Sequence, residues 1–334
     1  MEAVKERRRF GDRLLRLRGH APLETCDLRF RNFYDDDDAL LLNRWVWHVV
    51  ACRVRTFRLH KLSFDGFQLD DTPLVSQHLL TRLDLIGVHL KTRLCAFSSC
   101  PSLEHLEIDT CYWWDDINIS SESLKHHILY CDLSSQFRSL IHVPSLVSLT
   151  LDDHLSRAPV LGCMPSLQKA FVRVTHDNIP DGYSWGCDYE DCYSCSGIVH
   201  DNSSSMCALL EGLSEAENLA LIAESKFVFE KDLKQCPTFS KLKTLVLDDS
   251  WCVSPEFSAL TCILKHSPVL EKLTLQLFLL QGPQHKIEMI GRCSSMFRSV
   301  AVSEHLKAIE IKCQVVDEEI HKVSKFLCSF NICK

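Results

Sequence analysis

Residues 103–108, which read Leu-Glu-His-Leu-Glu-Ile, contain the pattern that decides the fold. In this pattern an apolar residue is followed by two variable residues, a second apolar residue, one variable residue and a third apolar residue. Clear copies begin at residues 54, 80, 103, 146, 242, 270 and 306, and weaker copies begin at residues 124, 167 and 216. In the copy that begins at residue 124, His127 occupies an apolar position. Most of the starts lie 21–28 residues apart.

This spacing and the apolar positions predict a leucine-rich-repeat solenoid of the α/β class. Such repeats are about 20–29 residues long. The last two apolar residues of each copy lie two apart, so both point to the same face of a short strand. One repeat cannot bury its apolar edge alone, whereas stacked repeats form a continuous core. We therefore expect a curved parallel sheet with helices or irregular segments on the convex side, and another α/β fold of amphipathic strands is the alternative.

Local signals between the copies agree with this prediction. The gap of 49 residues between the copies at 167 and 216 predicts one degenerate repeat near residues 185–210. Ser254 and Pro255 predict a helix start, and residues 206–213 predict a short helix. Proline has a fixed φ and no N–H group, which suits the approach to a strand. It precedes several expected strands, at Pro101, Pro144, Pro165, Pro237 and Pro268.

Both ends of the chain read as caps of the array. The four aspartates at 35–38 precede apolar residues at helical spacing and predict a helix start, since carboxylates stabilise a helix N-terminus. A divalent-cation site is the alternative there. Residues 306–312 predict a strand and residues 317–327 a helix with one apolar stripe. The chain thus divides into an N-terminal cap (residues 1–52), irregular repeats (residues 53–295) and a C-terminal cap (residues 296–334).

The composition excludes several classes of function. A formal charge of −7 and a pI near 6.1 do not provide the basic face that nucleic-acid binding requires. The basic run at residues 5–9 reads as a solvated terminus, with a weak nuclear address as the alternative. We find neither a secretory signal nor a run of about 18 apolar residues, so we expect no membrane contact and a cytoplasmic and/or nuclear location. The 18 cysteines are then reduced, and most should pack in the core.

One group of cysteines is a candidate metal site. Cys187, Cys192 and Cys195 lie close in sequence, with His200 and Cys207 nearby, and thiolates with an imidazole suit tetrahedral zinc. Only Cys192 and Cys195 have the tight spacing of a structural zinc pair, so reduced loop cysteines are the preferred interpretation. The chain contains no phosphate loop, no Gly-x-Ser-x-Gly motif and no His-Glu-x-x-His motif. We therefore expect a non-enzymatic protein without a cofactor.

Several segments resemble the plant F-box/LRR/FBD family. Residues 11–20 read GDRLLRLRGH, residues 44–55 begin with Arg-Trp and end with Arg-Val-Arg, and residues 207–216 read CALLEGLSEA. Residues 305–330 resemble the FBD module of that family. The likeness covers nearly the whole chain. It implies a substrate receptor of a Skp1–cullin–F-box ubiquitin ligase, whose repeats hold a target protein.

The resemblance begins directly after the position of the family's F-box, the segment that docks on the Skp1-like adaptor. Only about ten residues precede the match, and the FBD-like segment ends early. We therefore expect the target-binding half of such a receptor without its own F-box. A Skp1-like adaptor should then bind only if an F-box is supplied upstream. The alternatives are a stand-alone scaffold or decoy and a repeat protein that binds a small molecule.

The outward positions of the expected strands are the candidate partner-binding residues. They lie between the last two apolar residues of a copy or just beside them, and those between should be exposed. Their mixed charge points to a protein partner whose identity the pattern does not specify; the alternative is that they are only solvated strand residues. The candidates are Arg58, Arg82, Asp84, His105, Glu107, Thr150, Val246, Lys272, Thr274, Lys307 and Glu310.

Overall fold

The computed structural model is an α/β protein whose strands are mostly parallel. The chain forms two compact units, residues 1–146 (unit 1) and residues 147–334 (unit 2). The structure describes residues 2–30, 36–61, 69, 74, 77–90, 97–113, 118–131, 140–153, 159–174, 209–223, 233, 236–252, 257–277, 285–290, 303–313 and 318–328.

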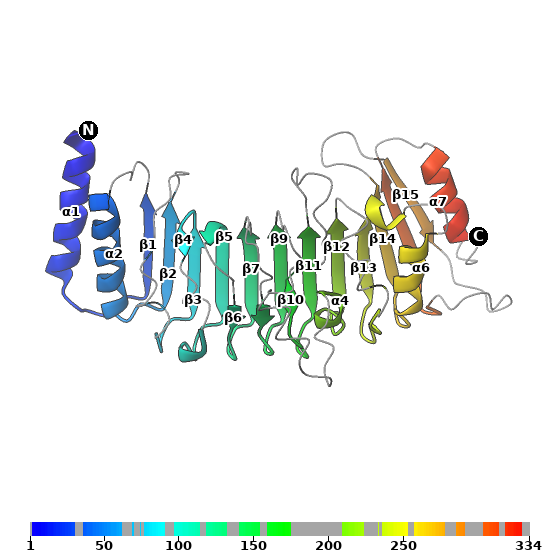
Figure 1. Cartoon of the computed structure of the whole chain (residues 1–334), viewed down its shortest axis with the longest axis horizontal. Coiled ribbons are helices and arrows are strands. Elements are labelled where there is room, and N and C mark those ends of the chain that lie inside the picture. The colour runs from blue at the N-terminus through cyan, green and yellow to red at the C-terminus, as the bar shows by residue number, and fades with distance from the viewer. Residues whose placement is uncertain are drawn as a thin grey trace, which may run out of the picture. The chain divides into compact units, whose positions relative to one another are not determined.

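Unit 1 begins with two helices that flank a strand: α1 (Glu2–Arg18), β1 (Thr25–Phe30) and α2 (Asp36–Ala51). Its main sheet has the order β1-β2-β3-β5-β7, and each strand is parallel to its neighbour (Figure 1). The strands after β1 are β2 (Thr56–Lys61), β3 (Arg82–Ile86), β5 (His105–Trp113) and β7 (His126–Cys131). Between them lie β4 (His89–Leu90), η3 (Phe97–Ser99) and β6 (Asn118–Ser120), and β8 (Leu140–His142) pairs with β6.

Unit 2 repeats the arrangement, with parallel strands in the order β9-β11-β12-β13-β14-β16. The strands are β9 (Ser148–Asp153), β11 (Lys169–Val174), β12 (Asn218–Ala223), β13 (Thr244–Asp248), β14 (Lys272–Leu277) and β16 (Ala308–Cys313). The remaining elements are β10 (Val160–Leu161), α4 (Leu209–Gly212), η4 (Asp249–Cys252), α6 (Ser258–Lys265), β15 (His285–Ile290) and α7 (Glu318–Cys328). Parallel strands at the repeat spacing are consistent with a leucine-rich-repeat-like solenoid.

Two expectations about the strands are wrong. β11 pairs directly with β12, so no strand of a degenerate repeat is inserted between them; residues 175–208 lie outside the described residues. β15 falls within the predicted repeats but runs antiparallel to β16, on the side away from β14. Because β15 lacks the apolar pattern it cannot stack as a repeat, and it instead pairs with the exposed edge of β16.

The predicted helices are present, with one shifted start. α2 begins within the aspartate run, and the side chains of that run lie outside the described residues. α4 falls within residues 206–213, and α7 buries Ile320, Val323 and Leu327 on one side. α6 begins at Ser258 rather than at Pro255. None of the described helices combines the length and the apolar character that crossing a membrane requires.

The apolar positions of the repeats form the core in both units. Each side chain at the last two apolar positions of the clear copies is at most 2% exposed. Adjacent strands pair residue for residue at these positions, so like positions stack, as Leu85 does on Ile108 and Leu247 on Leu275. In unit 1 the stacked residues are Phe57, Leu59, Leu83, Leu85, Leu106 and Ile108; in unit 2 they are Leu149, Leu151, Leu245, Leu247, Leu273, Leu275, Ile309 and Ile311.

In most repeats one backbone carbonyl sets the register of the next repeat. It belongs to the residue after the first apolar position and accepts two N–H groups. The carbonyl of Glu104 accepts from Lys125 and His126, both at 2.9 Å, and that of Lys243 accepts from Glu271 at 2.9 Å and Lys272 at 3.0 Å. A tight turn precedes this point, as where the Leu103 N–H donates to the Cys100 carbonyl at 3.0 Å around Pro101. Pro101, Pro144, Pro165 and Pro268 therefore mark these turns, whereas Pro237 lies before the turn between Phe239 and Leu242.

His127 is a polar residue in an apolar position of unit 1. It is opposite Leu106 on the neighbouring strand and only 1% exposed, while His126 beside it is half-buried. Neither ring nitrogen of His127 has a hydrogen-bond partner among the described residues. Burial lowers the pKa of His127 to about 4. The side chain is therefore neutral in the core at physiological pH.

We expect His127→Leu to stabilise the protein, most strongly in mild acid. In the unfolded chain His127 has an ordinary pKa of about 6.5, above its folded value of about 4. The unfolded state therefore binds more protons between these two pH values, and stability is lost as the pH falls through them. Leucine removes this loss and the unsatisfied nitrogens, so the free energy of unfolding should rise by about 1–3 kcal/mol at pH 7.

The measurement is urea unfolding of wild type and His127→Leu at a series of pH values between 4 and 7. His126→Leu is the matched control, since its half-buried ring does not occupy a core position. That control should keep the wild-type acid dependence. Identical acid dependence of wild type and His127→Leu would show that the ring is not held neutral by the core.

Candidate functional site

The outward side chains of unit 1 are brought together by the strand register. Arg58 on β2 is opposite Asp84 on β3, and Asp84 is opposite Glu107 on β5. Two residues before Asp84, and therefore on the same face of the sheet, Arg82 is opposite His105. Neighbouring parallel strands lie about 4.8 Å apart, so these side chains can interact directly. All five were candidates from the sequence, and the structure places them in one cluster, which we call the unit 1 face.

Asp84 is the centre of the unit 1 face. Its carboxylate accepts hydrogen bonds from Nε of Arg58 at 2.9 Å and from Nε of Arg82 at 2.9 Å. Arg82 also donates from Nη2 to Glu107 at 3.1 Å. The expectation that Asp84 is exposed is wrong: it is 3% exposed, because both guanidinium groups lie over it. Arg58, Arg82 and Glu107 remain half-buried and reach the surface.

Two histidines extend the unit 1 face to β7. The rings of His105 and His126 are stacked, with centroids 4.6 Å apart and planes 12° from parallel. Burial, followed by the neighbouring His126, lowers the pKa of His105, which favours its neutral form. His126 was not among the candidates because its repeat copy is weak. Its position two residues after the first apolar residue, the same as that of His105, is the signal that could have found it.

In unit 2 the candidates divide into smaller groups. Thr274 is opposite both Val246 and Glu310, and Glu310 pairs with Lys272 at 2.9 Å and Lys312 at 3.7 Å. The expected exposure is wrong for Thr274, which is 5% exposed, and for Glu310, which is 7% exposed. Glu310 pairs with its two lysines, and Thr274 lies on a central strand between Val246 and Glu310. Val246 is half-buried.

The other unit 2 candidates lie apart from that group. Thr150 is half-buried on β9, three strands from β13. Lys307 is exposed at the approach to β16, where it pairs with Glu271 at 2.8 Å. Arg173, which the sequence analysis did not single out, pairs with Asp152 at 2.9 Å and lies over the Phe171 ring at 5.2 Å. It too belongs to a weak copy of the pattern.

Several titratable groups outside the unit 1 face have pKa values raised by burial. Asp248, at the end of β13, accepts hydrogen bonds from the Ala223 N–H at 2.7 Å and the Ser250 hydroxyl at 2.6 Å, and burial raises its pKa to about 7. Burial also raises the pKa of Cys111 and of Cys252 to about 12, so both remain unreactive thiols. Among the described cysteines Cys52, Cys100, Cys111 and Cys313 are buried as the sequence predicted, whereas Cys252 is half-buried and Cys163 is exposed. Cys187, Cys192, Cys195, His200 and Cys207 lie outside the described residues.

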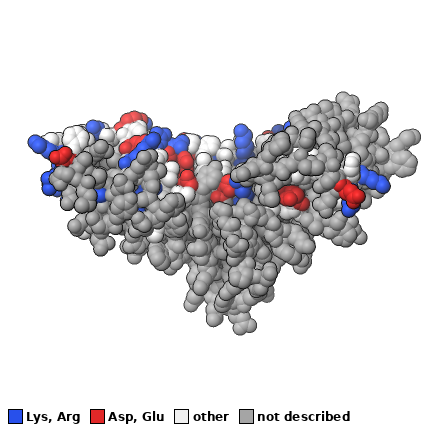
Figure 2. Space-filling model, turned by 90° about the horizontal axis from the view of Figure 1, so that it is seen from above, with Lys and Arg blue, Asp and Glu red and all other residues white. Residues whose placement is uncertain are grey.

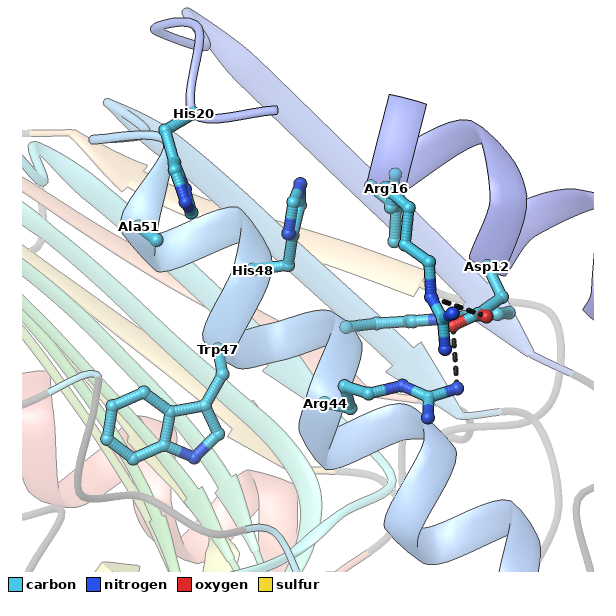
Figure 3. Close-up of a pocket in the computed structure, with 9 residues that line it drawn as sticks. Asp12, Arg16, His20, Arg44, Trp47, His48 and Ala51 are labelled. Atoms are coloured by element: carbon cyan, nitrogen blue, oxygen red, sulfur yellow. Dashed lines mark hydrogen bonds and ion pairs between the residues drawn. The ribbon is translucent and has the colours of Figure 1, made fainter. Parts of the chain in front are cut away.

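A pocket of about 300 Å³ lies between α1 and α2 in unit 1. Figure 3 shows Arg16 and Arg44 converging on Asp12, whose carboxylate pairs with them at 3.0 and 2.6 Å. The indole N–H of Trp45 also donates to Asp12, at 3.3 Å. Gly11 allows this packing, since a Cβ there would lie 3.0 Å from the Trp45 ring. The polar groups of the pocket thus hold the two helices together.

The other side of α1 presents an apolar stripe. Phe10, Leu14 and Leu17, spaced as i, i+4 and i+7, are 68%, 53% and 77% exposed. Such spacing places them along one face of the helix. Arg9 and Arg13 are exposed beside the stripe. Contiguous exposed apolar side chains with a polar rim are typical of protein-interaction surfaces.

Comparison of the chain with models of protein families, with curated proteins and with solved structures finds no match. Its function is therefore inferred from its own residues. Two arrangements in unit 1 stand out from the regular repeat: the charged unit 1 face and the apolar stripe of α1. Both are open to solvent at their edges.

We expect Asp84→Ala to destabilise unit 1 by about 1–3 kcal/mol, because it leaves two guanidinium groups side by side without their shared carboxylate. Asp27→Ala is the matched control: Asp27 pairs with Arg29 at 2.9 Å in an exposed position, and exposed pairs contribute little. Urea unfolding of the two variants measures the difference. Equal stability of both variants would contradict a structural role for the buried carboxylate.

Proposed function

We propose that this chain is a protein-binding module similar to the target-binding half of plant F-box/LRR/FBD receptors. The observation that carries the proposal is the unit 1 face, where Arg58, Arg82, Asp84 and Glu107 form one connected set of ion pairs across three adjacent strands. The family resemblance supplies the receptor assignment, and the repeat spacing with parallel strands supports the leucine-rich-repeat solenoid.

A protein partner suits this face better than a nucleic acid does. On this face Arg58 and Arg82 pair with Asp84 and Glu107. Figure 2 shows that basic and acidic side chains also lie near one another over the described surface that it draws. A polyanion is attracted by a field of one sign, whereas a folded protein can exchange ion pairs with alternating charges and so gain specificity. The half-buried arginines can turn from Asp84 and Glu107 toward a partner without leaving the surface.

The cap in unit 2 also supports the receptor assignment. β16 and α7, which correspond to the FBD-like segment, form a strand followed by a helix whose Ile320, Val323 and Leu327 are buried. The apolar stripe of α1 suggests a second protein contact at the N-terminal helix pair. A stand-alone scaffold or decoy would use the same face without ubiquitination, and it is the second candidate.

Neutralising the unit 1 face should remove specific partners while leaving the fold intact. In Arg58→Gln/Glu107→Gln the charges are lost but the Asp84–Arg82 pair is kept. The amount of each protein that contacts this face and co-purifies with the variant should be lower than with wild type by roughly tenfold or more, as expected when residues central to an interface are changed. Quantitative mass spectrometry of proteins that co-purify with wild type and variant, at equal thermal stability, measures this.

The matched control is Lys265→Gln/Glu211→Gln, which removes one charge of each sign from exposed helical positions of unit 2. It should retain the wild-type set of partners. An unchanged set in the unit 1 variant would contradict the proposed binding face.

The receptor assignment makes a second prediction about the adaptor. Residues 1–334 alone should not capture a Skp1-like adaptor, whereas the same residues joined downstream of an F-box should capture it. Co-precipitation of both versions with the purified adaptor tests this. Capture by residues 1–334 alone would place adaptor docking within this chain, and failure of the extended version would contradict the receptor assignment and favour a scaffold.

A further inference from the structure

Three potential metal ligands converge in unit 2. Cys236 lies in the segment before β13, and Cys262 and His266 lie on and just after α6. One ligand atom from each side chain lies within 4.8 Å of the other two. All three residues are half-buried. The sequence alone does not indicate this group, because Cys236 lies far along the chain from the other two.

The backbone holds these three residues in place independently of their side chains. The Phe239 N–H donates to the His266 carbonyl at 2.8 Å, which ties the segment of Cys236 to the end of α6. The His266 N–H donates in turn to the Cys262 carbonyl at 3.2 Å, and residues four apart on a helix face the same side. The ligands are therefore presented by two segments that are already joined.

The surroundings of His266 favour a bound cation. Its Nδ1 lies 2.8 Å from the Cys262 carbonyl oxygen and 3.9 Å from Cys262 Sγ. Metal-binding histidines usually donate the N–H of one ring nitrogen to a carbonyl or carboxylate, which orients the ring, and bind the ion through the other nitrogen. With Nδ1 of His266 on the Cys262 carbonyl, Nε2 is the nitrogen left to bind an ion. The site is also at the C-terminal end of α6, where the helix dipole favours positive charge.

We propose that Cys236, Cys262 and His266 bind one Zn²⁺ ion, with a water molecule as the fourth ligand. Two thiolates and an imidazole are ligands that select zinc over calcium or magnesium. Tetrahedral zinc, with Zn–S of about 2.3 Å and Zn–N of about 2.0 Å, needs these atoms closer together by roughly 1 Å than their widest separation, which side-chain rotation can supply. Binding releases the two thiol protons. The bound ion fixes the turn before β13 to the end of α6.

Cobalt(II) is the probe, because thiolate-bound tetrahedral cobalt absorbs in the near ultraviolet and the visible. The purified, reduced, metal-free full chain is titrated with Co²⁺, and Zn²⁺ is then added to displace it. One equivalent of tetrahedral cobalt should bind with thiolate charge-transfer bands, and Zn²⁺ should abolish them and raise the melting temperature. Cys262→Ser and His266→Gln should each weaken binding by more than about 100-fold, beyond the loss expected from an outer contact alone.

Control variants separate this site from the other cysteines of the chain, 18 in all. Cys163→Ser changes an exposed cysteine of unit 2, and Cys192→Ser changes the group of cysteines that the sequence offers as an alternative zinc site. Both should keep the full cobalt signal, and circular dichroism should show that every variant is folded. The proposal is overturned if wild type binds no tetrahedral cobalt, if Cys262→Ser and His266→Gln bind as wild type does, or if Cys192→Ser abolishes the signal.

Discussion

The register of both units depends on one recurring backbone contact, made by the carbonyl after the first apolar residue of most repeats. It accepts two N–H groups of the following repeat, as Glu104 does from Lys125 and His126. This contact fixes where each new strand begins, so the apolar residues two and four positions further along meet their counterparts. A slip of one residue would turn every apolar side chain to the outward face. The core and the outward face are therefore two consequences of the same contact.

Several of the residues whose carbonyls make this contact also form exposed ion pairs through their side chains. Glu104 pairs with Lys125 at 2.5 Å, and Glu217 pairs with Lys243 at 2.8 Å. Hydrogen bonding to each lysine lowers the pKa of the paired glutamate. Exposed pairs contribute little to stability. However, a shifted strand register would lose these pairs and could place like charges opposite one another, which is unfavourable. The pairs therefore support the register that the carbonyls set.

Several residues depart from the repeat pattern, both inside the core and outside it. His127 is an exception inside the core, while Asp84 is buried by its arginine partners on the outward face. The Cys236–Cys262–His266 group lies in the connections before and after β13, which no repeat position specifies. Sequences that satisfy the fold at most positions tend to break the pattern at functional or strained sites, which agrees with the placement of the proposed binding face and metal site.

The sequence by itself determined the repeat period, the buried positions, the turns at the prolines and the helices α2 and α7, because each depends on residues close together in the chain. It also identified Arg58, Arg82, His105 and Glu107 as outward residues. Only the tertiary structure decided that Asp84, Thr274 and Glu310 are buried, that β15 runs antiparallel, and that Cys236 meets His266. These features arise between repeats, where burial and proximity depend on which distant side chains the stacking brings side by side.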